Sequence, residues 1–313
     1  MPRSNRAFIS SEIGSYHIIS RTAGDSTWFN KQEKEYLMVL LEHFASGFFV
    51  KIHTFCIMSN HFHILLSGSE QEAEYADNKE LLRRYRKLYG KDSDPPVGST
   101  HSDGSLSIDD DGGMLRLRTR LGSVSRFIQE FKQSFSCWYN KRNNRKGYLW
   151  GERFKGLLVD KGDSELVCSA YIDLNPVRGG MVNRPEDYRW SGLGLRVRDE
   201  KRSEGFLYSV SDSDYYEVDD GLSFYRQFVY ESGGVGVEGK GSISKDVVVE
   251  VEKVCGRLDL GERLRYRVRN LSEGVAIGSE AFIAEIQRRG KRKFVRPRSV
   301  FGKVLYVTRV LRL

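Results

Sequence analysis

The feature that most constrains the fold is a pair of apolar segments, FFVKIHTFCIM (residues 48–58) and HFHILLS (61–67), separated by two residues. Both segments are rich in β-branched and aromatic residues, which favour strands. Ser59-Asn60 between them suits a tight turn, so the two segments are expected to pair as a hairpin. The chain therefore contains antiparallel sheet, and both histidines of HFH lie on one of its strands.

Further elements surround this hairpin, and apolar residues recur in them with the period of a strand or of a helix. The last helix is expected to end near Pro176, because proline disfavours helical geometry in the residue before it. The order of strand, helix, strand, strand, helix, strand, helix is typical of a ferredoxin-like (RRM-like) antiparallel sheet with helices on one face, which is an α+β fold. The predicted elements outside the hairpin are a strand at 15–22, a helix at 30–46, a helix at 123–142, a turn and strand at 147–160 and a helix at 163–177.

Composition divides the chain further. Residues 1–200 are expected to form the main domain, with a polar insertion at about 69–115 that contains one basic amphipathic segment and a loop poor in apolar residues. Residues 201–242 read as a linker-like region rich in Ser, Gly and Asp. Residues 243–313 form a basic C-terminal extension, expected to be mainly helical. Its candidates for DNA contact are two helix-like segments, 260–270 and 278–289, and the run RRGKRKFVRPR (288–298).

The charge balance favours an anionic partner, since 50 Lys and Arg stand against 42 Asp and Glu, a net charge of +8 with a pI near 9.2. The four cysteines are widely spaced and include no CxxC pair, which is typical of reduced thiols rather than disulfides or a zinc site. No apolar run suits a signal peptide or a membrane span, so the expected location is cytoplasmic, with nucleoid association when DNA is bound.

His61 and His63 are two apart on a predicted strand, so they lie on one face of the sheet with Phe62 on the other. Neutral imidazole is a common metal ligand, although two polar residues on the solvent face of a strand are the more ordinary arrangement. Tyr171 and Asn175 are spaced by one helical turn, as a nucleophile and an oxygen-type ligand to Mg²⁺ or Mn²⁺ would be. The alternative is that Tyr171 packs and Asn175 caps the helix.

A second pair, Tyr139 and Asn143, has the same spacing. Asn143 lies in an Asn/Lys/Arg/Gly-rich loop where the predicted helix ends, which is a poorer place to hold a ligand. Spacing alone leaves both pairs open.

Taken together, several blocks in this order resemble the single-tyrosine HUH transposases, and specifically the REP-associated tyrosine transposase branch of the IS200-like family. The resemblance covers roughly residues 13–195. Its most specific parts are the HFH strand, the GYLWGERFK block and YIDLNPVRGG, and the full set is SYHIISRT, CIMSNHFHILLSG, SVSRFIQEFKQSFSCWYNKR, GYLWGERFKGLLVD, AYIDLNPVRGGMV and PEDYRWSG.

This resemblance implies roles for particular residues. His61 and His63 would be metal ligands, Asn175 a third ligand, and Tyr171 rather than Tyr139 the nucleophile. The implied activity is metal-dependent cleavage of single-stranded DNA that forms hairpins. Tyr171 would attack a phosphate to give a 5′-phosphotyrosine link and a free 3′-OH, which allows strands to be rejoined in DNA transposition. Members of the family act as monomers or homodimers.

A single-stranded substrate needs cationic contacts to its backbone and aromatic surfaces for its bases. Candidates near the fourth strand are Arg145, Lys146, Trp150, Arg153 and Lys155, with solvated charge and a core tryptophan as the alternative. One rival function is a descendant of the same family that binds a DNA or RNA hairpin without cutting it. A second rival, a metal hydrolase barrel, would need further ligands, and His101 is the sole histidine after His63.

Overall fold

The computed structural model describes residues 14–24, 28–91, 93, 111–208, 221–234, 241–249, 274–289, 297–299 and 306–308. Within the chain, two compact units are distinguished by their internal contacts. We call residues 1–29, 52–66 and 150–313 the sheet unit, and residues 30–51 and 67–149 the helical unit.

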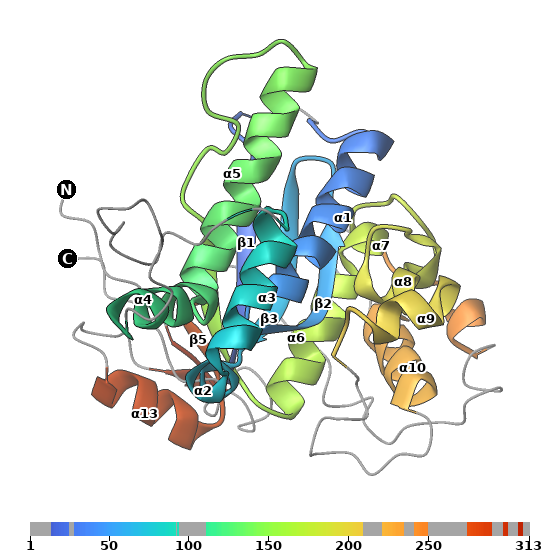
Figure 1. The fold of residues 1–313 in the computed structure, drawn as a ribbon. Helices are drawn as coiled ribbons and strands as arrows, with labels where there is room; N and C mark the ends of the chain where they lie inside the picture. Colours follow the sequence, from blue (N-terminus) through green and yellow to red (C-terminus); the bar gives the residue numbers. More distant parts are fainter. Residues whose placement is uncertain are drawn as a thin grey trace, which may run out of the picture. The chain divides into compact units, whose positions relative to one another are not determined.

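The predicted hairpin forms the first edge of the sheet. β2 (Val50–Ile57) and β3 (His61–Gly68) are joined by the turn at Ser59-Asn60, and the Met58 N–H donates to the His61 carbonyl at 2.8 Å. β1 (Gly14–Arg21) pairs antiparallel with β3 on one side and with β4 (Lys155–Asp160) on the other. The strand order β2-β3-β1-β4 is that of a ferredoxin-like sheet and confirms the predicted α+β class. Figure 1 labels β1, β2 and β3 of this sheet.

The sheet continues beyond β4 with strands from the C-terminal part of the chain. β5 (Ala276–Gly278) pairs parallel with β4, β7 (Tyr306–Thr308) pairs antiparallel with β5, and β6 (Arg298–Ser299) with β7. α13 (Glu280–Arg289) contacts β5 and β7, and matches the predicted segment 278–289. The expectation of a mainly helical extension therefore misses these three short strands. The predicted helix at 260–270 and most of the basic run at 288–298 lie outside the described residues.

One core cluster of the sheet unit joins strands to the helices that follow them. It combines Leu65 of β3, Val159 of β4 and Ile277 of β5 with Ile172 and Phe228. Ile172 belongs to α6, which contacts both β4 and α10. Helix α10 lies in the stretch where a linker was expected, and residues 235–240 after it lie outside the described residues. The helical elements concerned are α6 (Asp163–Asp173), α7 (Asn175–Arg178), the 3₁₀ turn η1 (Pro185–Asp187), α8 (Gly192–Arg198), α9 (Glu200–Glu204) and α10 (Gly221–Gly234).

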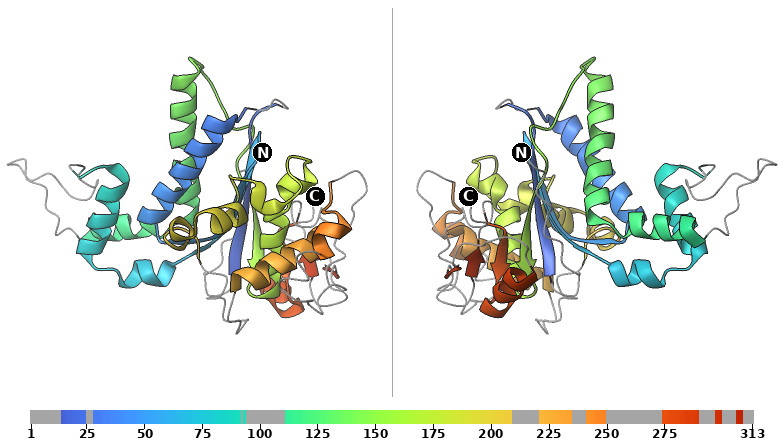
Figure 2. Two further views of the ribbon diagram at one scale, coloured as in Figure 1. Left: turned by 90° about the vertical axis from the view of Figure 1, so that its right-hand side faces the viewer. Right: turned by 90° about the vertical axis from the view of Figure 1, so that its left-hand side faces the viewer.

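The helical unit contains two long helices that pack side by side, α1 (Lys31–Gly47, blue) and α5 (Val124–Arg142, green) (Figure 2). The α1 N-terminus is fixed by a capping box between Asn30 and Glu33. The polar insertion contributes α2 (Glu70–Tyr75), α3 (Asn78–Tyr89) and α4 (Asp111–Leu121). The basic helix predicted there is α3, whereas α4 begins in residues that were expected to be loop and continues past the predicted end of the insertion. Among the described helices, none combines the length and the apolar character needed to cross a membrane.

Candidate functional site

The two histidines of the HFH strand face the same side of the sheet as residues from both neighbouring strands. The register places His61 opposite Arg21 and His63 opposite Ile19 on β1, and Ile19 in turn opposite Lys155 on β4. Because paired residues share a face, Arg21 and Lys155 lie on the histidine face. Phe62 points to the opposite face.

Each histidine uses its Nδ1 in a hydrogen bond. His61 Nδ1 lies 2.7 Å from the side-chain oxygen Oδ1 of Asn60, and since that oxygen only accepts, the proton belongs to His61 Nδ1. His63 Nδ1 lies 2.9 Å from Nε2 of His17, and the two rings stack with centroids 5.1 Å apart. When His63 Nδ1 is the donor in this pair, both histidines present an unprotonated Nε2. A second partner that fixes the tautomer in this way is usual for metal-binding histidines.

Burial keeps both imidazoles neutral. It lowers the pKa of His61 to about 4, helped by the positive charge of Arg21. The pKa of His63 is lowered by burial first, and then by His17, His61 and Arg21. A neutral imidazole is the form that binds a metal ion.

Tyr171 lies on α6 against the same face. Its ring makes edge contacts with His63 and with His17, at centroid distances of 5.9 Å and 5.8 Å. Only 7% of its surface is exposed. The structure thus brings Tyr171 to the histidine pair, although more than a hundred residues separate them in the chain.

Asn175 begins α7 at the break that ends α6. Pro176 has no N–H to donate to the carbonyl of Ile172, and the Asn175 side chain supplies the missing donor: its Nδ2 donates to Ile172 O at 3.2 Å and to Tyr171 O at 2.9 Å. With Nδ2 used in this way, the side-chain oxygen Oδ1 remains available as an acceptor. The capping role and the ligand role therefore use different atoms of one amide.

When His63 Nδ1 carries the proton of its pair with His17, the donor set fits a divalent cation. Two neutral imidazoles then present unprotonated Nε2 atoms, and the Asn175 amide oxygen lies one helical turn from Tyr171. No cluster of three or more His, Cys, Asp or Glu side chains suited to a metal occurs within the described part of the chain. A metal at this place would therefore depend on Asn175 as its third protein ligand.

The five candidate DNA-contact residues are divided between the two units. Lys155 is exposed at the start of β4 on the histidine face, and Arg153 is exposed just before it. Trp150 is half-buried and packs its edge against Phe62, at a centroid distance of 5.4 Å, so it lies on the face opposite the histidines. Arg145 and Lys146 belong to the helical unit, where Arg145 donates to the Tyr148 carbonyl at 3.1 Å.

The competing pair repeats the local geometry of Tyr171 and Asn175 without the histidines. Asn143 Nδ2 donates to the Tyr139 carbonyl at 2.9 Å, and the Tyr139 ring packs on Phe135 in the helical unit. Burial raises the pKa of Tyr139, which makes its phenolate harder to form.

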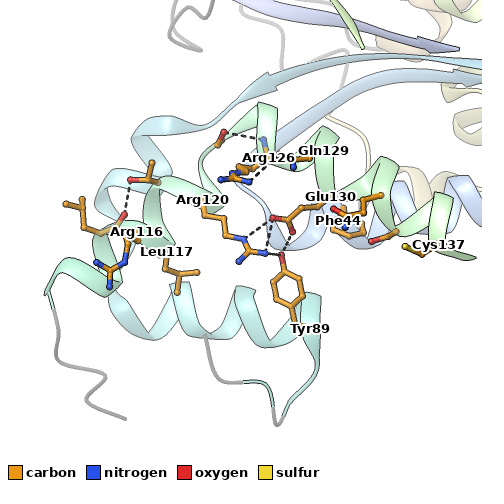
Figure 3. Close-up of a pocket in the computed structure, with 14 residues that line it drawn as sticks. Phe44, Tyr89, Arg116, Leu117, Arg120, Arg126, Gln129, Glu130 and Cys137 are labelled. Atoms are coloured by element: carbon orange, nitrogen blue, oxygen red, sulfur yellow. Dashed lines mark hydrogen bonds and ion pairs between the residues drawn. The ribbon is translucent and has the colours of Figure 1, made fainter. Parts of the chain in front are cut away.

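The helical unit has a pocket of about 990 Å³ between α4 and α5 (Figure 3). At its side, Glu130 accepts hydrogen bonds from Arg120, at 2.9 Å, and from the Tyr89 hydroxyl. The charges of Arg120 and Glu130 therefore compensate each other, and none of the predicted site residues lines this pocket.

Sequence reasoning missed three residues of the site. His17 is not among the predicted site residues, although the alternation in SYHIISRT places it on one face with Arg21. Asn60 was assigned to the turn alone. Arg178, at the end of α7, has its guanidinium carbon 5.4 Å from the centre of the Tyr171 ring.

Comparison with known proteins adds a family match to this geometry. Residues 11–74 match the model of the family described as "Transposase IS200 like". No curated protein matches the sequence. Among solved structures, the chain is similar to a REP-associated tyrosine transposase bound to a REP hairpin, with a TM-score of 0.38, 14% sequence identity, and coverage of 70% of this chain and 99% of that chain. The matched region contains β1 and the HFH strand, so the resemblance that the sequence motifs indicated, to the IS200-like transposases, is confirmed over residues 11–74.

Proposed function

We propose that this protein is a metal-dependent single-stranded DNA endonuclease of the transposase type, with Tyr171 as its nucleophile. The observation that carries the proposal is the edge contact of the Tyr171 ring with His63, beside His61, whose Nδ1 donates to Asn60 Oδ1 and leaves its Nε2 unprotonated. The match of residues 11–74 to IS200-like transposases supports the same chemistry.

In the proposed reaction, the phenolic oxygen of Tyr171 attacks the phosphorus of a DNA phosphodiester. A bond forms between that oxygen and phosphorus, and the bond from phosphorus to the 3′-oxygen breaks. The proton that Tyr171 loses balances the proton that the departing 3′-oxygen gains. The products are a 5′-phosphotyrosine and a free 3′-OH, and the reverse attack by a 3′-OH rejoins strands.

His61, His63 and Asn175 would hold a Mg²⁺ or Mn²⁺ ion. Such an ion, when bound, withdraws charge from phosphate oxygens and helps to orient the phosphate. The neutral state of the histidines and the second hydrogen bond on each Nδ1 are what this chain contributes to holding it.

Positive charge on the histidine face suits a DNA backbone. Within the described residues, neither Arg21 nor Lys155 has a carboxylate within ion-pair distance, and both are exposed. Uncompensated cations beside a metal site favour an anionic ligand. The preference for hairpin-forming DNA comes from the family resemblance of the motifs. The alternative function is binding of a DNA or RNA hairpin without cleavage.

The test incubates the protein with end-labelled single-stranded DNA hairpins and Mg²⁺ or Mn²⁺, and measures covalent protein–DNA adduct after denaturation. We expect an adduct that requires metal, that is absent from Tyr171→Phe and His63→Ala, and that persists in the matched controls Tyr139→Phe and His53→Ala. An adduct that survives in Tyr171→Phe would overturn the assignment. Tight hairpin binding with no adduct from any hairpin or metal would favour the binding-only alternative.

A further inference from the structure

Arg178 is a charged residue beside Tyr171, the proposed nucleophile. The proposed reaction gives Arg178 no role. It is the last residue of α7, two helical turns after Tyr171. Its guanidinium carbon lies 5.4 Å from the centre of the Tyr171 ring. Its backbone is held in the helix, since the Arg178 N–H donates to the Leu174 carbonyl at 3.0 Å.

Among the described residues, nothing compensates the charge of this guanidinium. Its Nη1 is buried and has no hydrogen-bond partner there, and no carboxylate in the described part of the chain lies within ion-pair distance of it. Arg196, a buried arginine of the same unit, shows the contrast: its Nη2 donates to two backbone carbonyls, those of His53 at 2.9 Å and Tyr208 at 2.7 Å. Burial also lowers the pKa of Arg178, which reflects the cost of enclosing its charge.

Enclosing a cation without a partner is unfavourable, and proteins rarely do so without a ligand in place. The face of the Tyr171 ring offers some compensation, but a cation–π contact leaves the N–H donors unsatisfied. A phosphate supplies what is missing, because its oxygens match the planar donors of a guanidinium in pairs.

We propose that Arg178 is a further catalytic residue, which binds a non-bridging oxygen of the DNA phosphate that Tyr171 attacks. This proposal rests on the proposed function, since it names the group that holds the target phosphate beside the nucleophile. The guanidinium neutralises negative charge on the non-bridging oxygens, and charge on those oxygens repels an incoming phenolate. Arg178 binds and orients; it donates no proton in this step.

The proposal predicts a coupling between Arg178 and one particular phosphate, which a methylphosphonate scan of a DNA hairpin with single-stranded flanks measures. In each probe one phosphodiester of the flanks is replaced by a neutral methylphosphonate. Binding is measured without metal in the Tyr171→Phe background, so that no chemistry occurs. With Arg178 present, one linkage is expected to weaken binding by about 10-fold to 100-fold, the range for a hydrogen bond to a charged group.

In Arg178→Gln, the methylphosphonate at that one linkage should weaken binding by less than about 3-fold. The loss of affinity at every other linkage should stay unchanged, as a double-mutant cycle requires. The matched control is Arg198→Gln, which removes an exposed arginine of α8 and should leave the whole scan unaltered. Arg178→Lys should restore part of the penalty, because it keeps the charge and loses the paired donors. Circular dichroism and thermal melts of Arg178→Gln verify that it folds.

Two outcomes would overturn the role of Arg178. One is a scan that Arg178→Gln leaves unchanged; the other is an Arg178-dependent linkage that differs from the linkage cleaved by the wild-type protein with metal. Failure of the proposed function gives a different pattern, in which the wild-type protein forms no adduct with any metal while the scan still reports which phosphate Arg178 binds.

Discussion

Asp173 provides a test of how α6 is held in place, because this helix carries Tyr171 two residues before Asp173 and ends two residues before Asn175. Its carboxylate is fully buried. Oδ2 accepts from Thr54 Oγ1 at 2.9 Å and from the Tyr225 hydroxyl at 2.5 Å, and Oδ1 accepts from the Leu193 N–H at 3.0 Å. One side chain thus ties α6 to β2, α8 and α10.

Removing this carboxylate in Asp173→Ala leaves three buried donors without an acceptor. We expect a loss of about 3–5 kcal/mol in the free energy of unfolding, the range for breaking a buried polar network. Asp173→Asn should lose about 1–2 kcal/mol, because its oxygen still accepts from Leu193 while its NH₂ donates to the two hydroxyl oxygens. Urea unfolding followed by tryptophan fluorescence measures both. Equal losses below about 1 kcal/mol for the two variants would refute the assignment of Asp173 as the anchor of α6.

The pH dependence of the free energy of unfolding, compared between the wild-type protein and Asp173→Asn, is a second test of this carboxyl group. Burial raises the pKa of Asp173, against the opposing effect of its hydrogen bonds with Tyr225, Leu193 and Thr54 and of the charge of Arg196. A carboxyl whose folded-state pKa is raised contributes stability below its unfolded pKa of about 3.9, and loses it as the pH rises through the folded pKa. The free energy of unfolding of the wild-type protein should therefore exceed that of Asp173→Asn by the largest amount near pH 4, and this difference should shrink toward pH 7. The total decrease is about 1.4 kcal/mol for each pH unit by which folding raises the pKa of Asp173. A difference that grows toward pH 7 would contradict this sign.

Three further predictions address the site and its frame. His17→Phe removes the ring nitrogen that hydrogen-bonds with His63 Nδ1 and should weaken Mn²⁺ binding by about 10-fold to 100-fold in calorimetric titrations, whereas His53→Phe should not; equal affinities in both variants would contradict the role of His17. Gly194→Ala places a Cβ against the Tyr188 carbonyl and should cost about 1–3 kcal/mol in thermal unfolding, while Gly205→Ala, whose nearest neighbours lie at 3.7 Å, should be neutral; a tolerated Gly194→Ala would argue against that close approach. Trp150→Ala should cost about 2–3 kcal/mol, since the ring packs on two phenylalanines, and a loss of DNA affinity with unchanged stability would instead assign Trp150 to base stacking.

The sequence predicted the central part of the fold because there the local signals agree. The alternation in SYHIISRT and around HFH has the period of a strand, and the pairing observed for β1 with β3 follows from it. Pro176 correctly marked the end of α6, since its missing N–H breaks the helical ladder. The three C-terminal strands were missed because segments of two or three residues have no measurable period. α10 was missed because Ser- and Gly-rich neighbours outweighed the helical spacing of Tyr225, Phe228 and Val229.

The site was predictable in part for a related reason. Spacing of residues within one element identified His61 with His63 and Tyr171 with Asn175, but it could not choose between Tyr171 and Tyr139, which have the same local pattern. The contact of Tyr171 with His63 is a tertiary one, set by how α6 packs on the sheet. Spacing places His17 on one strand face with Arg21, and Arg178 two helical turns after Tyr171, but their contacts with His63 and with the Tyr171 ring are tertiary ones that spacing does not reveal.

The central claim is that Tyr171 becomes covalently bound to DNA through a 5′-phosphate. The most direct measurement digests the adduct formed by the wild-type protein with protease and nuclease, and identifies the nucleotide-bearing peptide by tandem mass spectrometry. We predict a 5′-phosphonucleotide on Tyr171, in the peptide that contains AYIDLNPVR. A nucleotide on Tyr139, on any other residue, or linked through a 3′-phosphate would contradict the account.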